Sequence, residues 1–371
     1  MTLSFALSPA LRLLQTEARD VARDGAERFG RTNDSWINGY SKEFSRLLAR
    51  RGWIGMTWPI EFGGGGRPGI ERVIVAEQLI SAGAPIAASW IADRQMGPAI
   101  YRYGTDDQKA KFLPGMLSGE DTWCIGMSEP NAGSDLAALH TSAHRVGDRF
   151  VVNGQKIWTS LAAEADYCYL IVRTDSSGPP HKGVSELIVP MTSPGIEVRP
   201  ITDLVGNRHF CEVWFTDVEV PTENLVGVEG DAFRQTMAQL EHERGGIDRL
   251  MSNRPLYDDA MRLANLDDHL IRQAIAKLET GYRLGRQMVY QAALGQAPPG
   301  ASTMIKCFCT EHEQRVAEFC SRVFGPRGVA DADLGRAIAY APAYTIQGGT
   351  SNVMRNILGE RVLGLPREQS K

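Results

Sequence analysis

The residue pattern of the chain changes at the segment Cys124-Ile-Gly-Met-Ser-Glu-Pro-Asn-Ala-Gly-Ser-Asp135. This segment leaves a short apolar run and enters a loop that is dense in small and hydroxyl-bearing residues. Such a loop lets backbone N–H groups approach a ligand closely, and Ser128 and Ser134 can donate hydrogen bonds to it. Alone, the segment also fits an ordinary turn. A second segment, Gln155-Lys-Ile-Trp-Thr-Ser160, follows at a strand end and offers an indole and two further hydroxyls.

Around this segment, β-branched and aromatic runs alternate with turn signals. Strands are predicted over residues 150–158, 167–172, 185–189 and 212–220. No helical pattern separates them, which favours an antiparallel β-domain over βαβ units.

The regions on both sides have apolar residues at helical spacing. Helices are predicted over residues 11–22, 40–51, 71–82 and 106–116, then over 231–244, 256–263, 268–294, 302–324 and 350–363. The order is therefore α, then β, then α. We expect an α+β protein with an N-terminal helical domain (1–120), a middle β-domain (121–228) and a C-terminal helical domain (229–371).

The composition is that of a globular protein. Hydrophobic residues make up 43% of the 371 residues and charged residues 23%, with a net charge of −4. The acidic balance argues against a nucleic-acid binder, and no apolar stretch reaches the roughly 18 residues of a membrane span. The six scattered cysteines predict reduced thiols in the cytoplasm.

A third segment, Gln347-Gly-Gly-Thr-Ser-Asn-Val-Met-Arg355, opens the last predicted helix. Its glycines permit close approach and its hydroxyls can cap the helix. Together, the three segments resemble the acyl-CoA dehydrogenase family. Gly52-Trp-Ile-Gly-Met-Thr-Trp-Pro59 and Gly359-Glu-Arg-Val-Leu-Gly-Leu-Pro-Arg367 extend the resemblance over nearly the whole chain. It implies the family's three-domain fold, in which helical domains flank a β-domain.

The resemblance implies FAD as cofactor. It assigns flavin contacts to Met127, Ser128, Ser134, Trp158, Ser160, Thr350 and Asn352. Arg262 and Gln273 have the spacing of two family residues that reach the flavin of a neighbouring subunit, although Asn265 and Leu266 replace the usual residues between them. The resemblance also assigns acyl-CoA contacts to Ser134, Arg244, Gly348 and Gly349.

The family removes an α-proton and a β-hydride from an acyl-CoA thioester. Many members carry the base in Tyr-Glu-Gly-Thr, where this chain has Gln347-Gly-Gly-Thr350, so Gly348 cannot serve. Members with the base on an earlier helix match this chain at Glu243, which we expect to be the base. Glu241, two positions away, points elsewhere on a helix and is the weaker candidate. The N–H of Gly348 can still polarise the thioester oxygen.

The segment after Glu243 is shorter than in the common family pattern. Only 19 positions separate Glu243 from Arg262, and Pro255 lies between them. Because proline breaks or kinks a helix, we expect an interrupted helix and an acyl pocket of altered shape, suited to a branched or bulky acyl group.

Other readings stay open at this point. The chain could be an inactive or flavin-poor subunit of a heteromeric dehydrogenase, because Pro326 removes a donor from a phosphate-contacting loop. A flavin monooxygenase or oxidase on the same fold is a further alternative. The main hypothesis implies a homo- or hetero-oligomer that passes electrons to an electron-transferring flavoprotein. No metal site is expected, because neither Glu241-His-Glu243 nor Glu311-His-Glu313 aims its side chains at one point.

Overall fold

The computed structural model describes residues 7–366, except for the side chains of residues 240–243, 329 and 332. Its contacts divide the chain into two compact units. The first, here called the helical unit, comprises residues 7–44, 66–86 and 244–366 of the described chain. The second, called the sheet unit, comprises Ser45–Gly65 and Ala87–Glu243.

The sheet unit is built on eight strands within its described residues. They are β1 (Trp123–Gly126), β2 (Ser142–Val146), β3 (Arg149–Ser160), β4 (Tyr167–Arg173), β5 (Val184–Pro190), β6 (Ile196–Ile201), β7 (Phe210–Pro221) and β8 (Leu225–Val226). Their order is β6-β7-β3-β2-β4-β5-β8, and β1 pairs with β4. Most pairs are antiparallel, as expected, but β1–β4 and the short β2–β4 contact are parallel.

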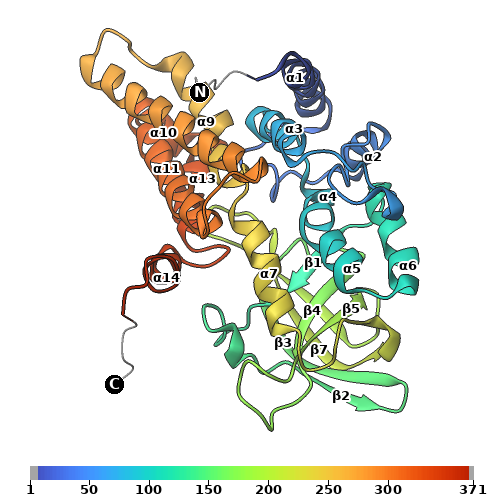
Figure 1. Ribbon diagram of the computed structural model, residues 1–371. Coiled ribbons are helices and arrows are strands. Elements are labelled where there is room, and N and C mark those ends of the chain that lie inside the picture. The colour runs from blue at the N-terminus through green and yellow to red at the C-terminus, as the bar shows by residue number, and fades with distance from the viewer. Residues whose placement is uncertain (1–6, 367–371) are drawn as a thin grey trace. The chain divides into compact units, whose positions relative to one another are not determined.

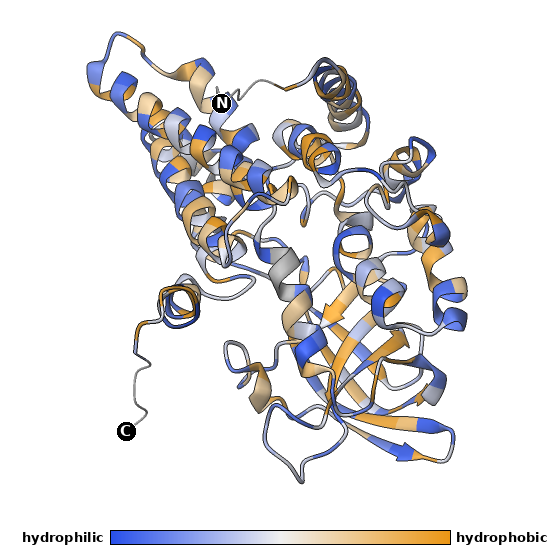
Figure 2. Cartoon of the chain, in the orientation of Figure 1, coloured by the Kyte–Doolittle hydropathy of each residue, from blue (hydrophilic) through white to orange (hydrophobic). Residues whose placement is uncertain are grey.

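The sheet has an apolar layer on each face. Along β4, Tyr169 and Ile171 join the core shared with the helices, whereas Cys168, Leu170 and Val172 join the opposite core. This alternation follows from the two-residue period of a strand. Both faces are therefore buried, and β4 and β5 appear hydrophobic in Figure 2.

Helices cover one face of this sheet. They are α4 (Ala87–Ile91), a π-helical turn (Ala92–Met96), α5 (Gly97–Tyr103), α6 (Asp106–Leu117) and α7 (Phe233–Arg244). In Figure 1, α5 and α6 lie beside β1, β4 and β5. Phe112 of α6 packs edge-on against Trp123 of β1, with ring centroids 5.7 Å apart. Thr105 begins α6 with a capping box, in which its side chain and that of Gln108 exchange bonds with each other's backbone.

The helical unit packs long amphipathic helices together. It contains α1 (Pro9–Phe29), α3 (Gly69–Ala82), α8 (Asp248–Met251), α9 (Arg254–Leu263), α10 (His269–Ala293), α11 (Ala301–Phe324), α12 (Arg327–Ala330), α13 (Ala332–Tyr340) and α14 (Ser351–Ile357), with a π-turn over Leu358–Val362. The helix α2 (Lys42–Arg50) runs from this unit into the other. Figure 1 shows α10 and α11 side by side.

The predicted interruption after Glu243 is present. The helix α7 ends at Arg244, α8 spans one turn, and α9 begins at Arg254 with Pro255 in its first turn. Proline is tolerated there because the first residues of a helix have no intrahelical acceptor for their N–H groups. The first break therefore falls at Gly245-Gly246, upstream of the proline, and a second falls at residues 252–253.

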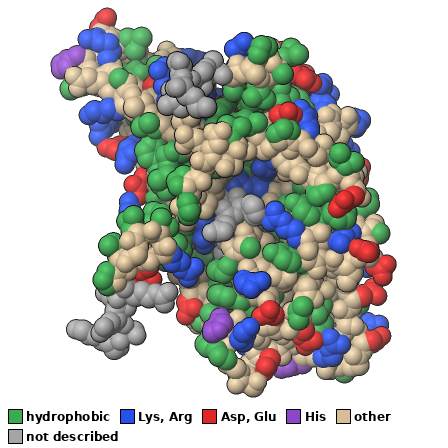
Figure 3. All heavy atoms as spheres, viewed as in Figure 1, with side chains coloured by type: hydrophobic (Ala, Val, Ile, Leu, Met, Phe, Trp, Pro, Cys, Tyr) green, Lys and Arg blue, Asp and Glu red, His purple; other side chains and the backbone are tan. Residues whose placement is uncertain are grey.

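Among the described residues, no helix combines the length and apolarity needed to cross a membrane. All six cysteines are buried and free of disulfides. On the face in Figure 3, basic, acidic and hydrophobic side chains are interspersed.

Candidate active site

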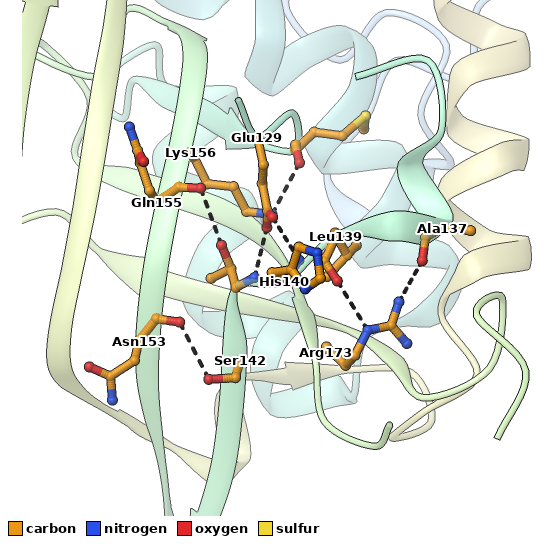
Figure 4. A network of polar contacts seen from close by, with 11 residues as sticks. Glu129, Ala137, Leu139, His140, Ser142, Asn153, Gln155, Lys156 and Arg173 are labelled. Atoms are coloured by element: carbon orange, nitrogen blue, oxygen red, sulfur yellow. Dashed lines mark hydrogen bonds and ion pairs between the residues drawn. The ribbon is translucent and has the colours of Figure 1, made fainter. Parts of the chain in front are cut away.

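A buried ion pair holds the loop that carries Met127 and Ser128. The Lys156 ammonium lies 2.8 Å from a Glu129 carboxylate oxygen, and both side chains are almost fully buried. Lys156 also donates to the carbonyl of Met127 at 3.1 Å. The Glu129 carboxylate accepts the backbone N–H groups of His140 and Thr141 at 2.6 and 2.8 Å. Figure 4 shows this network joining the loop to β3 and to the segment before β2.

The electrostatics of the pair depend on these contacts. Burial alone would raise the pKa of Glu129, but the charge of Lys156 and the hydrogen bonds from Lys156, Thr141 and His140 outweigh it and lower that pKa. Glu129 is therefore an anion, and both of its oxygens accept hydrogen bonds inside the protein. Two of the three donors are backbone N–H groups, so the contacts of Glu129 hold the backbone in place.

Arg173 secures the far side of the same loop. Its guanidinium donates to the carbonyls of Leu139 and Ala137 at 3.1 and 2.7 Å (Figure 4). The N–H of Ile157 donates to the carbonyl of Ser128 at 2.9 Å. The loop backbone is thus tied at both ends, while the hydroxyls of Ser128 and Ser134 have no hydrogen-bond partner among the described residues. They remain available to a ligand.

Trp158 stands out from β3 at a bulge. The register with β7 shifts between Lys156 and Thr159, and Trp158 has a backbone φ of +59°. A left-handed conformation costs a non-glycine residue about 1–2 kcal/mol. Its indole is 55% exposed and meets Phe210 edge-on at 5.8 Å. A large ring that is exposed on strained backbone fits a binding platform better than a packing role. Ser160, two residues on, is half-buried.

In the helical unit, Arg244 meets the third predicted segment. Its Nε donates to the carbonyl of Gly348 at 3.2 Å, although Arg244 is only 9% exposed. Gly348 and Gly349 have φ values of +64° and +93°. A side chain at either position would be strained in this conformation. Thr350 caps α14 by accepting the N–H of Val353 at 3.2 Å.

The remaining predicted residues lie on three different helices or have side chains outside the described residues. Asn352 is exposed on α14, and Gln273 is exposed on α10. Arg262 lies at the end of α9, where its exposed side chain pairs with Asp259 at 2.9 Å. The side chains of Glu243 and Glu241 lie outside the described residues. No group of three or more metal-ligating side chains occurs in the described part of the chain.

The helix that carries position 243 is anchored by a buried carboxyl. Glu186 of β5 is fully buried and accepts hydrogen bonds from Thr236 of α7 at 2.6 Å and from Tyr169 at 2.7 Å. Gln239, one turn further along α7, also donates to it at 3.3 Å. Burial raises the pKa of Glu186 to about 7, against the opposing effect of these hydrogen bonds. Thr236 and Gln239 therefore fix the first two turns of α7 on the sheet.

Three family models match this chain in the expected order. They are the acyl-CoA dehydrogenase N-terminal domain over residues 8–120, the middle domain over 124–218 and the C-terminal domain over 230–363. The chain belongs to the acyl-CoA dehydrogenase family.

Individual relatives of this acyl-CoA dehydrogenase agree. "Acyl-CoA dehydrogenase IpdE1" of Mycobacterium tuberculosis is 36% identical over 90% of this chain and 92% of its own length. The solved "Tcur3481-Tcur3483 steroid ACAD" has 29% identity and a TM-score of 0.89, covering 99% of this chain and 100% of the other. The ChsE4-ChsE5 complex from Mycobacterium tuberculosis has 30% identity and a TM-score of 0.85, with 99% and 100% coverage. The chain is thus an enzyme of a flavoprotein family.

Three residues of this acyl-CoA dehydrogenase were not singled out from sequence. Glu129 and Lys156 lie inside two of the quoted segments, and Glu186 interrupts the apolar strand Ser185-Glu-Leu-Ile-Val189. A charged residue within a strand buried on both faces must have a partner, so the signal was present. The identity of each partner was not, since Lys156 is 27 positions from Glu129 and Thr236 is 50 from Glu186.

Proposed function

We propose that this acyl-CoA dehydrogenase uses FAD to convert an acyl-CoA thioester into its 2-enoyl-CoA, with Glu243 removing the α-proton. The observation that carries the proposal is the pre-set loop around Met127 and Ser128, whose backbone is held by a buried ion pair while its hydroxyls stay free. A site whose supporting contacts are complete before ligand arrives is what efficient binding requires. The proposal includes three domains, with boundaries near residues 120 and 228.

The residues present fit a flavin. Trp158 offers an exposed ring on strained backbone, and Ser128, Ser134 and Ser160 offer hydroxyl donors. Met127 joins them on the loop, and Thr350 and Asn352 belong to the opening turn of α14. Bound FAD would supply the acceptor for the β-hydride. Arg262 and Gln273 would contact the flavin of a neighbouring subunit, which agrees with their exposure.

The protein's own groups would carry out the proton chemistry. Position 243 lies in the last turn of α7, two turns after Thr236, and α7 is fixed on the sheet through Glu186. A carboxylate there would take the α-proton once substrate excludes water, since removal of water raises its basicity. Arg244 holds the carbonyl of Gly348, so the Gly348 N–H would be set to stabilise the developing charge on the thioester oxygen.

The substrate class proposed is an acyl-CoA with a bulky or branched acyl group, including a steroid-derived one. The breaks at Gly245-Gly246 and residues 252–253 support it, because they interrupt the helix that borders the acyl group in this family. The solved relative described as a steroid ACAD, and the ChsE4-ChsE5 complex, support a bulky substrate and a heteromeric assembly respectively. An electron-transferring flavoprotein would accept the electrons. Free buried cysteines agree with work in the reducing cytoplasm.

The test is flavin bleaching by substrate. The purified protein, alone and after co-expression with a homologous subunit, is mixed anaerobically with short-chain, branched and steroid-side-chain acyl-CoAs. We expect bleaching of bound flavin, and a loss of about 10³-fold in rate in Glu243→Gln, within the range for a lost general base. Glu241→Gln is the matched control and should react normally.

Other results would contradict the proposal. Normal bleaching in Glu243→Gln would remove Glu243 as the base. A colourless protein in both preparations would favour a subunit without flavin chemistry, and turnover that requires oxygen would favour a monooxygenase or oxidase.

A further inference from the structure

A large cavity in the helical unit has an unusual lining. It measures about 810 Å³ and is bordered by α1, α3, α9 and α10, and Met251 of α8 also lines it. Seven arginines line it against four acidic side chains, an excess of three positive charges in a chain whose net charge is −4. Its volume lies within the range of about 300–1,000 Å³ that is typical of small-molecule sites. A concave surface with an excess of one sign of charge concentrates the potential inside it.

Two of these arginines are neutralised by neighbouring carboxylates. Arg254 pairs with Asp258 at 2.9 Å and with Glu279 at 3.6 Å. Arg286 pairs with Glu77, which is 1% exposed and also accepts the Tyr290 hydroxyl at 2.6 Å. These pairs account for three of the four acidic residues of the cavity; the fourth is Glu27 of α1.

The other arginines exceed their counter-charges. Arg31 and Arg262 share the single carboxylate of Asp259, at 2.8 and 2.9 Å. Arg19 donates to the neutral side chain of Gln78 at 3.2 Å.

Two further arginines have no partner within the described part of the chain. Arg23 and Arg283 form neither an ion pair nor a hydrogen bond with any residue that the structure describes. Arg19 and Arg23 are four positions apart on α1, so both lie on one face of that helix. The helices α1 and α10 thus present guanidinium groups to the same cavity, and these groups form no ion pair with the described residues.

A buried aromatic ring completes the lining between the arginines. Tyr282 lines the cavity and is 3% exposed, yet its hydroxyl has no hydrogen-bond partner within the described chain. The ring is fixed between Tyr257 at 5.5 Å and His312 at 4.5 Å, and the Arg254 guanidinium lies 5.0 Å above it. The hydroxyl oxygen is itself buried, so the ring, and not the hydroxyl, faces the cavity.

We propose that this cavity binds a small molecule with adjacent phosphate groups, such as a nucleoside diphosphate, between Arg19 and Arg23 on one side and Arg283 on the other. Guanidinium groups suit phosphate oxygens because they donate two parallel hydrogen bonds. Unpartnered arginines on two helices match an anion with two charged groups, and the cavity leaves room for a nucleoside. The inference does not depend on the proposed dehydrogenation.

The test uses the flavin-loaded protein with inorganic pyrophosphate and ADP as probes. Titration calorimetry and thermal unfolding are compared with sulfate and citrate at equal ionic strength. We expect both probes to bind and raise the melting temperature, and the binding to weaken as salt rises. Arg23→Gln/Arg283→Gln should lose at least about tenfold in affinity, since a charge-assisted hydrogen bond contributes about 1.5–3 kcal/mol.

Two further variants separate binding from folding. Arg28→Gln, on α1 but outside the cavity and paired only with Asp24 among described residues, should bind the probes normally. Tyr282→Phe removes a hydroxyl that the cavity does not reach, so it should keep both the fold and the affinity for the probes. Without ligand, the double arginine variant should melt at the same or a higher temperature than the parent, because it relieves like-charge repulsion.

Four outcomes would overturn the proposal. They are equal stabilisation by sulfate, equal or tighter binding of citrate, unchanged affinity in the double variant, and release of flavin by pyrophosphate. The last would place the phosphate at the flavin site instead of this cavity.

Discussion

The sheet unit and the helical unit use charge in opposite ways. In the sheet unit, Glu129 and Lys156 are buried, opposite in sign and 2.8 Å apart, with their other polar atoms bonded to backbone. In the helical unit, Arg23 and Arg283 share a cavity wall with other arginines and have no counter-charge within the described residues. The first arrangement holds the loop backbone in place. The second leaves guanidinium groups that can still bind an anion.

This contrast shows why the contacts that support the loop at Met127 are complete before a ligand binds, whereas the charges of the cavity are not compensated. A buried pair is kept only if its geometry and its additional hydrogen bonds offset the loss of water. An exposed cluster of like charges meets no such requirement, because water and salt screen it. The variants below break one side of this comparison at a time.

The largest effect is expected from Lys156→Met. It leaves the Glu129 carboxylate buried without a counter-charge, which typically costs about 3–5 kcal/mol in the free energy of unfolding. Denaturant unfolding followed by circular dichroism measures it, and flavin affinity should fall with it. Glu129→Gln/Lys156→Met should recover most of the stability, because both buried charges are then gone.

The matched control lies on the same strand. Arg149 of β3 pairs with Glu219 at 3.0 Å, with both side chains more than half exposed. Arg149→Met should cost no more than about 1 kcal/mol. If it costs as much as Lys156→Met, burial is not what makes the Glu129–Lys156 pair strong.

The next effect concerns pH and compares one buried carboxyl from each unit. Burial raises the pKa of Glu186 from 4.5 to about 7 in the sheet unit, and that of Asp34 from 3.8 to about 6 in the helical unit. Between its unfolded and folded pKa, each group holds a proton when folded and has lost it when unfolded. Stability therefore falls as pH rises, by up to about 1.4 kcal/mol per pH unit for each group.

The window from pH 6 to 7 separates the two groups. Glu186 contributes most of the slope there, because Asp34 is already half ionised at pH 6 and almost fully ionised at pH 7. Glu186→Gln should therefore flatten the slope clearly more than Asp34→Asn. Urea unfolding at pH 5, 6, 7 and 8 gives the slopes, and the constant offset of each variant is ignored. His209 and His312, whose pKa values burial lowers to about 4, act with the opposite sign but equally in all variants. An unchanged slope in Glu186→Gln would mean that its carboxyl is ionised when folded.

Sequence reasoning predicted those parts of the fold that local pattern decides. In the helices α3, α10 and α11, apolar residues recur at helical spacing over several turns and the ends are clearly marked. These helices fall close to the predicted ranges. Residues 87–103 gave no prediction, because they are short, mostly apolar on all sides and interrupted by a π-turn. The strand β6 has partly exposed, polar residues on the edge of the sheet, which also obscures its pattern.

The candidate site likewise has residues that a local pattern predicts and residues that only the folded structure brings together. Motifs predicted the loop at Met127, the ring at Trp158 and the glycines at 348 and 349, because each is a contiguous segment. The anchors Glu186 and Lys156 depend on partners far along the chain, so only the folded structure pairs them. The arginines of the cavity come from α1, α9 and α10, so no single segment of the sequence predicts it.

The smallest change in stability is expected from Trp158→Gly, which tests whether the sheet unit holds its ring for a ligand. Glycine relieves the strain of a +59° φ, while the edge-on contact with Phe210 is lost. These terms are each about 1 kcal/mol and oppose one another, so the free energy of unfolding should change by less than about 1 kcal/mol. Flavin affinity, measured by fluorescence titration of the apoprotein, should fall at least tenfold.

Leu161 supplies the control, because it has nearly the same backbone conformation but the opposite exposure. Its φ is +61° and its side chain is 3% exposed. Leu161→Gly gains the same relief of strain but opens a cavity, so it should lose about 2 kcal/mol or more. If both variants lose equal stability, Trp158 is packed in the protein in solution. If Trp158→Gly keeps both its stability and its flavin affinity, the exposed ring is not the platform that its strained backbone indicates.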